Sequence, residues 1–486
     1  MISGLVERTK IFLRPDPSKV LLRFFPYGNK ERMLRIIARI MSLSDGEIRK
    51  ELDHVLHHFE ERHIDIREIL LSHYKKVAPV MVTDLEPAEE RRLLIGAYFT
   101  SEYALESAAL FNPSVVPHPD QSKMEKGNLR FIMSLRAIGE GHISSLSFRS
   151  GIISDSYDIF LEETSEFVTV GETVLNPTYE KNCFALKLYE VGFENDFSKE
   201  ILGALPDEFT FSALDSEIKN VKIRHRRHTS LFSETLRAIN TLAECNYEIS
   251  FSDRQRLSER VIFPYASNEQ KGIEDARFVR FFDEENKKAT YYATYTAYSG
   301  TTSFPQLIET DDFLHFRFIT LNGSAVRNKG MALFPRKVDG KYVMLSRQDN
   351  ENIFIMYSDN IHFWHEAEVI MKPSYPWGFV QLGNCGSPIE TDRGWLVLTH
   401  HVGPMRRYCI GAILLDPEDP SRVIGRLKEP LMEPDDNERE GYVPNVVYTC
   451  GALLYGGKLV MPYAMSDHVT SIAMVDMERL MKKLLE

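Results

Sequence analysis

Short β-like runs, each followed by a tight turn and a further run, recur from Gly272 to the C-terminus of this chain of 486 residues. Turns such as "DGK", "DRG" and "GGK" separate runs rich in Val, Ile, Tyr and Phe. With the stretch from Asn112 to Phe148, they make five similar units of three or four strands. Repeated blocks of strands without alternating helices are typical of a β-propeller. We therefore expect a mainly β fold, a five-bladed β-propeller, with a β-sandwich carrying insertions as the alternative.

Helices are expected ahead of the strands. Apolar residues recur at three- and four-residue spacing from residue 31 to about residue 109, and Ser44 with Glu47 fits a capping box. A further helix is expected over Ser230–Cys245. The predicted domains are an N-terminal helical segment at residues 1–100 and a propeller domain at residues 101–486, with an insertion near residues 152–245.

Composition restricts the partners and the compartment. A net charge of −12 argues against a non-specific nucleic-acid binder, which needs a basic face. The chain has no apolar stretch long enough for a membrane span, and its first residues carry charges too early for a secretory signal. Its 5 cysteines form no CxxC pair, which argues against a disulfide framework or a zinc site. These features predict a cytoplasmic protein without a bound metal, and a homo-oligomer remains open.

Polar residues interrupt the strand-like runs at matching places in successive units. In a propeller such residues would converge around a central depression. Acids that face a group of cations can protonate a leaving group, and an arginine fork binds phosphate or carboxylate. The chain has no Walker loop, no GxGxxG before a helix, no HExxH and no GxSxG, which disfavours a nucleotide, metal or esterase mechanism. The candidate residues are Asn112, Arg136, Glu274, Asp275, Arg277, Arg327, Asn328, Arg347, His400, His401 and Asp467.

Seven stretches in order resemble one family. They are "GIEDAR" followed by "YYATYTAYSG", then "RNKGMALFP", "GKYVMLSR", "GSPIETDRGWLVLTHHVG", "IGAILLDPEDPSRVIGR" and "EREGYVPNVVYTCGA". Together they resemble glycoside hydrolase family 130 over residues 105–486. The resemblance implies a five-bladed propeller and the inverting phosphorolysis of β-mannosides, most closely β-1,2-linked mannooligosaccharides, to α-mannose 1-phosphate. Inorganic phosphate would be the co-substrate, and no cofactor is implied.

The resemblance also assigns roles to residues. Asp275 matches the general acid, acting through the 3-hydroxyl of the bound mannose. Substrate-binding roles fall to Asn112, Arg136 and Asp467, with Glu274 and Arg277 orienting the acid. The phosphate site would comprise Arg327, Asn328, Arg347, His400 and Tyr408.

The chain departs from the family pattern at two positions. Ala276 stands where the family usually has a proline, and Gln381 stands where phosphorylases commonly carry a lysine. The retained cations favour phosphorolysis, whereas hydrolysis by a β-mannosidase of the same family and a β-1,4-mannosyl substrate are the alternatives. Two further alternatives are a non-catalytic carbohydrate-binding propeller and a furanosidase-type hydrolase, whose second acid would be Glu140 or Glu440.

Overall fold

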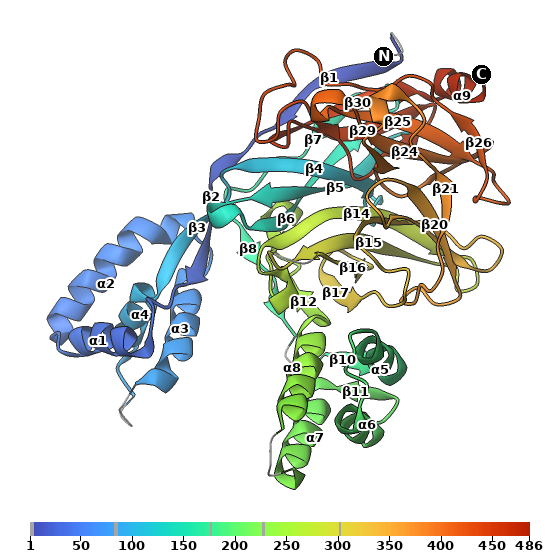
Figure 1. Cartoon of the computed structure of the whole chain (residues 1–486). Coiled ribbons are helices and arrows are strands. Elements are labelled where there is room, and N and C mark those ends of the chain that lie inside the picture. The colour runs from blue at the N-terminus through green and yellow to red at the C-terminus, as the bar shows by residue number, and fades with distance from the viewer. Residues whose placement is uncertain (1–3, 82–85, 175–176, 226–228, 301–302) are drawn as a thin grey trace.

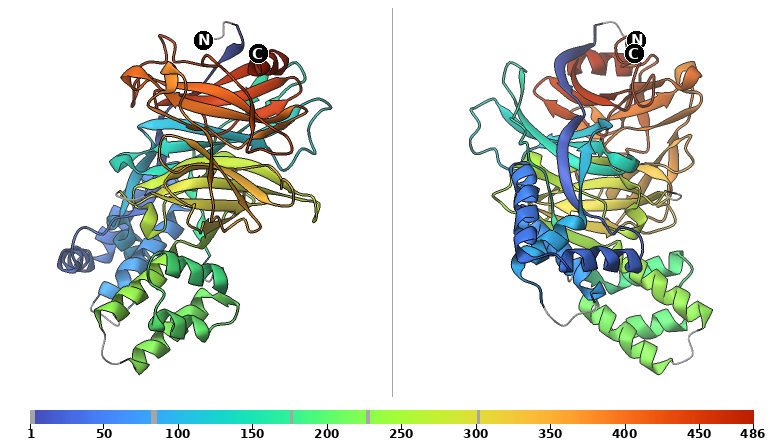
Figure 2. Two further views of the ribbon diagram at one scale, coloured as in Figure 1. Left: turned by 45° about the vertical axis from the view of Figure 1, so that its right-hand side comes forward. Right: turned by 90° about the vertical axis from the view of Figure 1, so that its left-hand side faces the viewer.

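The computed structural model describes residues 4–81, 86–174, 177–225, 229–300 and 303–486. A body of strands forms most of the molecule, and two groups of helices project from its lower part (Figure 1). The first strand and the last helix lie close together at the opposite end of the body (Figure 1, Figure 2), where the Arg479 guanidinium donates to the Gly4 carbonyl at 2.7 Å. The first and the last described elements therefore both lie against the body of strands, far from the two groups of helices.

The largest sheet has 12 strands and contains two successive antiparallel meanders. One parallel pairing, Gly272 with Ser144, joins the meanders at the start of β14 and β6. The predicted strands in "RFIMSLRAI" and "HISSLSFRSGII" are confirmed as β5 and β6. The first meander is β4 (Ala109–Pro117), β5 (Leu129–Ile138) and β6 (Ser144–Ile153), and the second is β14 (Gly272–Asp283), β15 (Lys288–Tyr298), β16 (Ser303–Thr310) and β17 (His315–Thr320). Short strands complete the sheet: β7 (Ile159–Leu161), β8 (Thr169–Val170), β9 (Glu172–Thr173), β12 (Tyr247–Ser250) and β13 (Arg260–Ile262).

Three further groups of strands follow along the chain. The last of them takes the first strand of the protein, β1, which pairs with β30. One group is β18 (Lys329–Leu333), β19 (Tyr342–Arg347), β20 (Ile353–Ser358) and β21 (Glu368–Met371), and the next is β22 (Gln381–Asn384), β23 (Ile389–Thr391), β24 (Gly394–Val402), β25 (Tyr408–Leu415) and β26 (Val423–Arg426). The last is β27 (Val447–Tyr448), β28 (Leu453–Tyr455), β29 (Lys458–Met465), β30 (Val469–Asp476) and β1 (Val6–Leu13), followed by helix α9 (Met477–Leu485).

Contacts between these groups run in a series that returns to its start. Strand β4 lies against β14, β15 against β18, β19 against β22, β25 against β27, and β29 against β4. The β4, β14 and β18 strands each open their own group, so the beginnings of successive groups come together. This arrangement brings residues far apart in the sequence to one end of the strands.

The N-terminal segment is not helical throughout, which corrects the expectation for residues 1–100 and for the stretch up to residue 109. Two strands precede the helices, and "TSEYALE" is a third, which pairs antiparallel with β2 and buries Tyr103 and Leu105. The predicted capping box is confirmed: Ser44 accepts from the Glu47 backbone and Glu47 accepts from that of Ser44. The elements are β2 (Asp16–Phe24), α1 (Lys30–Met41), α2 (Asp45–Phe59), α3 (Ile66–Val77), α4 (Glu89–Tyr98) and β3 (Thr100–Glu106).

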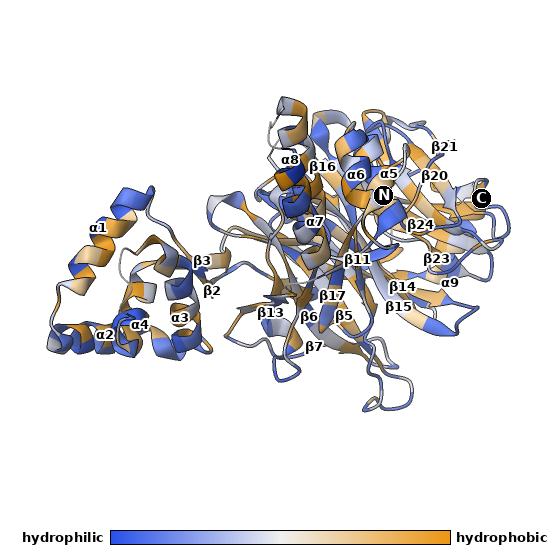
Figure 3. Cartoon of the chain, turned by 90° about the horizontal axis from the view of Figure 1, so that it is seen from below, coloured by the Kyte–Doolittle hydropathy of each residue, from blue (hydrophilic) through white to orange (hydrophobic). Residues whose placement is uncertain are grey.

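A second helical group lies between β9 and β12 and has a hydrophobic core of its own. The predicted helix over Ser230–Cys245 is observed as α8, with Thr229 as its N-cap and Cys245 as its C-cap. Phe232, Ile239 and Leu214 are fully buried within this group. Seen from below, it stands apart from α1–α4 (Figure 3). Its elements are β10 (Thr178–Glu180), α5 (Lys181–Glu190), α6 (Asp196–Gly203), β11 (Glu208–Thr210), α7 (Phe211–Arg224) and α8 (Ser230–Glu244).

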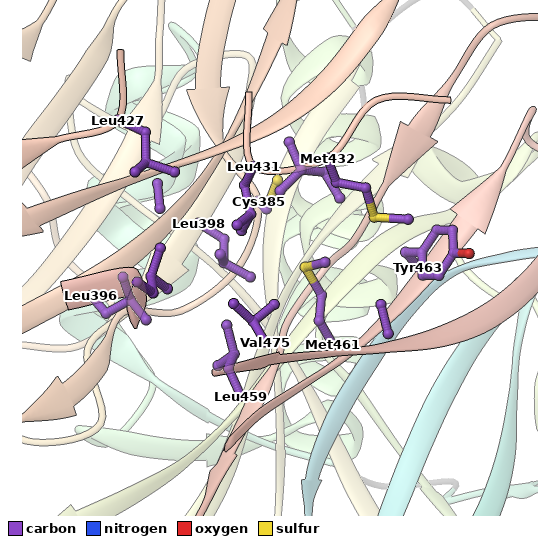
Figure 4. Close-up of a cluster of buried hydrophobic side chains, with 14 of the residues drawn as sticks. Cys385, Leu396, Leu398, Leu427, Leu431, Met432, Leu459, Met461, Tyr463 and Val475 are labelled. Atoms are coloured by element: carbon purple, nitrogen blue, oxygen red, sulfur yellow. The ribbon is translucent and has the colours of Figure 1, made fainter. Parts of the chain in front are cut away.

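The core lies between the strand groups. In the C-terminal part, leucines of β24 and β25 pack against β29 and the loop before β27 (Figure 4). Strand β24 is buried at every position, which fits its nearly continuous apolar sequence "GWLVLTHHV". Burying each such large apolar side chain stabilises the fold by about 1.5–3 kcal/mol. Two histidines are nevertheless enclosed in this strand, at His400 and His401.

Among the described residues, none of the helices combines the length and the apolar character that crossing a membrane requires.

Candidate active site

The same irregularity interrupts β4, β14 and β18, the strands that open three successive groups. In each, the pairing register skips so that two residues oppose one on the neighbouring strand. Such β-bulges re-aim side chains at functional sites. The bulged pairs are Asn112–Pro113, Asp275–Ala276 and Gly330–Met331, and φ at the first residue of each is 47°, 54° and 89°.

Left-handed backbone at Asn112 and Asp275 carries a conformational cost. A non-glycine residue held there costs on the order of 1 kcal/mol or more and persists where the surroundings fix it. Here the two bulges turn the side chains toward each other, and the Asn112 amide nitrogen donates to Asp275 Oδ1 at 2.7 Å. Two strands 163 positions apart are thereby joined through their strained residues.

Asp275 is held as a carboxylate. It also accepts from Arg136 Nη1 at 3.1 Å. Burial raises the pKa of the Asp275 carboxyl, but the neighbouring cations, first of all Arg136, outweigh burial and lower the pKa to about 2. In the ligand-free protein the group is therefore ionised at neutral pH.

Arg136 forms hydrogen bonds with both acidic residues near the start of β14, Glu274 and Asp275. Its Nη2 donates to Glu274 Oε1 at 2.7 Å, and its Nε donates to Ser144 Oγ at 2.9 Å. The guanidinium also lies over the Phe111 ring, 5.1 Å from its centre. With Nη1 on Asp275, each nitrogen of the fork has a partner, so its position is fixed before a ligand arrives.

Asp467 joins this cluster from the turn between β29 and β30. Its backbone is also left-handed, with φ of 49°. Burial and the negative charge of Asp275, against the attraction of Arg136, raise the pKa of Asp467 to about 6. Two carboxylates beside one guanidinium thus have pKa values moved in opposite directions, a pattern found where groups perform acid–base work.

Arg277 belongs to the framework that surrounds Asp275. It is 5% exposed, and its three nitrogens donate to protein groups. Nε bonds the Cys385 carbonyl at 2.7 Å, Nη1 the Met331 carbonyl at 3.2 Å, and Nη2 the Tyr448 hydroxyl at 2.8 Å. Each partner comes from another strand group, so Arg277 ties the groups together at the site.

A second buried cluster contains Arg347 and His400. Arg347 Nη1 lies 2.8 Å from His400 Nε2, and the two residues are 8% and 1% exposed. Burial, followed by the nearby guanidinium charges, moves the pKa of His400 well below its usual value, so the imidazole is neutral and accepts from Arg347. Within the part of the chain that the structure describes, Arg347 Nε has no hydrogen-bond partner.

Two glycines leave the room that the Arg347–His400 pair occupies. A Cβ at Gly383 would lie 2.5 Å from His400 Cε1 and 2.9 Å from Arg347 Cδ. At Gly330, with φ of 89°, a Cβ would lie 3.1 Å from Arg347 Cβ. The glycines of "RNKG" and "QLGN" are therefore required by close approach rather than by turns.

Tyr408 and the "RN" pair lie around this cluster at different depths. The Tyr408 ring stacks on His400 with 6.0 Å between ring centres. Asn328, left-handed at φ of 61°, donates weakly to the Gln348 carbonyl at 3.4 Å. Arg327 is exposed, and its Nε donates to the Ser324 carbonyl at 2.8 Å. The cluster thus contains Tyr408, whereas the described hydrogen bond of Arg327 lies outside it.

His401 faces away from the cluster because successive side chains of a strand point to opposite faces. Its Nε2 lies 3.0 Å from Thr399 Oγ1, and its ring packs on Trp377 with 3.9 Å between centres. Glu140 and Glu440, the acids considered for a furanosidase mechanism, are both exposed.

Lys329 and Tyr448 belong to the site but do not follow from the sequence pattern alone. Lys329 pairs in register with Arg347, its Nζ lies 3.8 Å from Glu274 Oε2, and its charge lowers the pKa of Asp275. Tyr448 accepts from Arg277, and its ring lies 5.2 Å from that of His400. The position of Lys329 directly after "RN" was the available signal, whereas Tyr448 had none.

Comparison with known proteins shows which family the second half of the chain resembles in sequence. The sequence model of glycoside hydrolase family 130, described as beta-1,4-mannooligosaccharide phosphorylase, matches residues 230–486. A 1,2-beta-oligomannan phosphorylase of Thermoanaerobacter sp. is 34% identical over 230 residues, which are 46% of this chain and 74% of that protein. A beta-1,2-mannobiose phosphorylase of Listeria innocua is 35% identical over 226 residues, or 45% of this chain and 61% of that protein.

Two further matches share a shorter aligned stretch or a lower identity with this chain. A beta-1,4-mannooligosaccharide phosphorylase of Ruminococcus albus is 34% identical over 158 residues, 30% of this chain and 47% of that protein. The solved structure of the Listeria innocua beta-1,2-mannobiose phosphorylase in complex with beta-1,2-mannobiose aligns with 79% of this chain and 93% of its own, at 20% identity and a TM-score of 0.47. On the family match, which covers more than half of its residues, this chain belongs to glycoside hydrolase family 130.

Proposed function

We propose that this protein is an inverting β-mannoside phosphorylase that acts on β-1,2-linked mannooligosaccharides. The observation that carries the proposal is the adjacency of two clusters, a carboxylate cluster around Asp275 and a buried cationic cluster around Arg347. Tyr448 touches both, since it accepts from Arg277 and lies against His400. The names of two similar relatives, both phosphorylases of β-1,2-linked mannosides, support the same chemistry.

The fold that suits this site is a five-bladed β-propeller. The closed series of contacts between five strand groups supports it, as does the repeated bulge in β4, β14 and β18. Strand β1 would complete the last strand group of the catalytic domain, which residues 101–486 would otherwise form with the insertion near 152–245, and the segment from β2 to about residue 100 would be an extension. The reaction would take place where the opening strands of the five groups meet.

The carboxylate cluster is suited to hold the reacting mannosyl unit. Asn112, Arg136 and Asp467 offer an amide, a guanidinium and a carboxylate in one small space, and hydroxyl groups bond with all three. Glu274 and Arg277 keep Asp275 in place, Glu274 through Arg136 and Arg277 through the strands that it joins. Asp275 would then contact the 3-hydroxyl of the sugar.

The proton has to come from Asp275, which is ionised in the ligand-free protein. A bound sugar excludes water, and a bound phosphate dianion places further negative charge near the carboxylate. Both effects raise the pKa of a carboxyl group. Substrate binding would therefore move Asp275 toward the protonated form that the reaction needs. The proton would pass through the sugar 3-hydroxyl to the leaving oxygen.

The cationic cluster is suited to hold phosphate. Arg347 Nε has no hydrogen-bond partner among the described residues, and a guanidinium with a neutral imidazole beside it binds phosphate oxygens by charge and by hydrogen bonds. Asn328 and Tyr408 lie next to the pair, with Arg327 at the edge. Lys329 pairs in register with Arg347 and lies near Glu274, so it would add a cation between the two clusters and offset the absence of a lysine at Gln381.

The bond changes balance without a protein base. A phosphate oxygen attacks the anomeric carbon, the bond from that carbon to the aglycone oxygen breaks, and the released electron pair takes the proton that originates on Asp275. The configuration inverts, and α-mannose 1-phosphate and a shortened sugar are formed. Fixed cations that stabilise the attacking dianion in place can supply much of the rate.

Proton NMR of the products tests this proposal. β-1,2-Mannobiose is incubated with the protein in phosphate-free buffer and again in millimolar phosphate; α-mannose 1-phosphate should appear only in the second reaction. Free mannose formed at one rate in both, without mannose 1-phosphate, would assign the protein as a β-mannosidase. Preferential turnover of a β-1,4-linked disaccharide would correct the linkage alone.

A matched pair of variants tests the acid. Asp275→Asn should keep the fold and lower kcat by about 10²-fold or more, since a positioned proton donor contributes 10²–10⁴-fold. Asp339→Asn is the control, because Asp339 is also left-handed, at φ of 49°, but exposed in the turn before β19. Retention of more than about a tenth of the activity by Asp275→Asn would show that another residue is the acid.

A further inference from the structure

A large groove separates the helical group α5–α8 from the strands. Its volume is about 1050 Å³. One wall is formed by α5 and α8, and the other by the beginning of β16, the end of β17 and the loop that leads to β18. Such a volume exceeds what one monosaccharide fills and matches the upper range of small-molecule pockets.

Two buried amides lie at the groove without a full set of partners. Gln306 is 0% exposed and Asn268 is 7% exposed, and both line the groove. Gln306 Nε2 and Asn268 Oδ1 have no hydrogen-bond partner among the described residues. The other end of the Gln306 amide accepts from the Tyr295 hydroxyl at 2.8 Å, so turning the amide over would still leave one polar atom without a partner. Both atoms are buried in the empty groove, so an occupant with hydroxyl groups would pair with them once the amides turn toward it, which removes the cost of leaving them unpaired.

Aromatic rings complete the groove. Tyr189, at the end of α5, is 64% exposed, and Phe304, at the start of β16, is 39% exposed. They belong to opposite walls. Rings of this kind supply flat apolar area at low conformational cost, which suits the C–H face of a pyranose, while amides suit its hydroxyl groups.

The groove continues from the proposed reaction site. Arg327 and Asn328 line it, and Asn328 also donates to the carbonyl of Gln348, the neighbour of Arg347 in the cationic cluster. In the sheet, Glu274 pairs with Thr296, and Thr296 pairs with Pro305 of the groove wall. Neighbouring strands are about 4.8 Å apart, so two steps across the sheet span roughly 10 Å at the same end of the strands.

We propose that this groove binds mannosyl units of the oligosaccharide that lie beyond the reacting linkage, and that the helical group α5–α8 thereby favours long chains over disaccharides. This inference rests on the proposed function. Buried amides, facing aromatic rings and continuity with Asp275 together fit a neutral, hydroxyl-rich chain. A second copy of this protein would instead have to cover the amides with its own polar groups.

The test compares substrate lengths. For Tyr189→Ala and Phe304→Ala, kcat/KM is measured on a β-1,2-linked mannohexaose and on the disaccharide at saturating phosphate. The ratio of the two values should fall about tenfold in each variant, and further in the double variant. Phe160→Ala, which removes a 61% exposed ring of β7 outside the groove, is the control and should keep the wild-type ratio. An unchanged ratio in the double variant would overturn the inference.

A binding measurement separates this inference from the proposed function. Calorimetry with Asp275→Asn, which is not expected to turn the sugar over, gives the affinity for the mannohexaose with and without the two aromatic substitutions. Weaker hexaose binding in the substituted protein supports the groove even if the enzyme proves to be a hydrolase. Equal affinities in an active phosphorylase would reject the groove alone, and a change of mass in light scattering without a change of affinity would show that a second copy occupies it.

Discussion

At the scale of single residues, Asp275 and Asp467 lie near the same guanidinium, that of Arg136, yet their pKa values shift in opposite directions. Asp275 accepts directly from Arg136 and from Asn112, and its pKa falls to about 2. For Asp467 burial is the largest influence, with repulsion from Asp275 added to it, and its pKa rises to about 6. Asp467 is therefore the member of the pair that titrates in an accessible pH range.

This difference predicts an acid limb in the pH profile. Below about pH 6, Asp467 takes up a proton and can no longer accept two hydrogen bonds from sugar hydroxyls, so kcat/KM for the mannoside should fall as the pH decreases through 6. The profile of kcat/KM reports groups of the free enzyme. Besides Asp275 and Arg136, the charged group that acts on Asp467 is Arg406.

The Asp467→Asn variant provides the decisive comparison. It should have a lower kcat/KM at pH 7.5 and no limb near pH 6, because its amide does not titrate. Persistence of the same limb in this variant would assign the titration to another group. Asp275 should contribute no limb here, since its pKa lies about four units lower in the free protein.

At the scale of elements, bulges and glycines determine where the charged side chains lie. The bulges in β4 and β14 turn Asn112 and Asp275 toward each other. The glycine in β22 lets β24 and β19 place His400 and Arg347 in contact. A side chain at this glycine would separate the pair without removing either member.

Gly383→Ala should therefore impair the use of phosphate. The added Cβ would lie 2.5 Å from His400 Cε1, so the ring or the strand has to shift. Since small displacements of binding groups are costly, the KM for phosphate should rise about tenfold or more. Kinetics with varied phosphate at saturating mannoside measure this effect.

Gly46→Ala is the matched control. No atom lies within 4 Å of a Cβ placed there, on α2, and alanine is favoured over glycine in a helix by about 0.5–1 kcal/mol. This variant should keep the wild-type KM for phosphate and show a slightly higher melting temperature. Equal phosphate kinetics in Gly383→Ala would show that the Arg347–His400 pair does not hold the anion.

At the scale of the whole molecule, the N-terminal strand joins the two ends of the described chain by pairing with a C-terminal strand. Strand β1 pairs with β30, and Arg8 forms a fork with Glu438, with Nε–Oε1 at 2.8 Å and Nη2–Oε2 at 2.9 Å. Glu438 is 3% exposed and also accepts from the Tyr463 hydroxyl at 2.6 Å. Without Arg8, a buried carboxylate would lose its charged partner.

Arg8→Met should therefore destabilise the protein. Loss of one partner of a largely buried pair is expected to lower the free energy of unfolding by about 2 kcal/mol, less than for a fully buried pair because Arg8 is partly exposed. Chemical unfolding measures the change. Lys483→Met removes the surface pair with Glu486 and should change the free energy by less than about 0.5 kcal/mol. A similar small effect for Arg8→Met would show that β1 contributes little to the closure.

The sequence by itself determined the class of the fold and the types of the functional residues. The strand-and-turn pattern after Gly272 predicted the mainly β body, and the periodicity of "SDGEIRKELDHVLHHF" predicted α2 with its capping box. These features follow from neighbouring residues, so local rules reveal them. The motif "GIEDAR" indicated Asp275 as the acid through its resemblance to the family.

Tertiary structure alone decided which of these residues meet. The pairing of β1 with β30 joins the two ends of the chain, and no local pattern in "VERTKIFL" predicts that β30 is the strand with which it pairs. Arg277 stands two positions after Asp275, yet it donates to groups up to 171 positions away. Lys329 enters the site because β18 pairs with β19. Such contacts depend on how the strand groups pack, because the side chains that touch are brought together by the closed series of strands and not by their spacing in the chain.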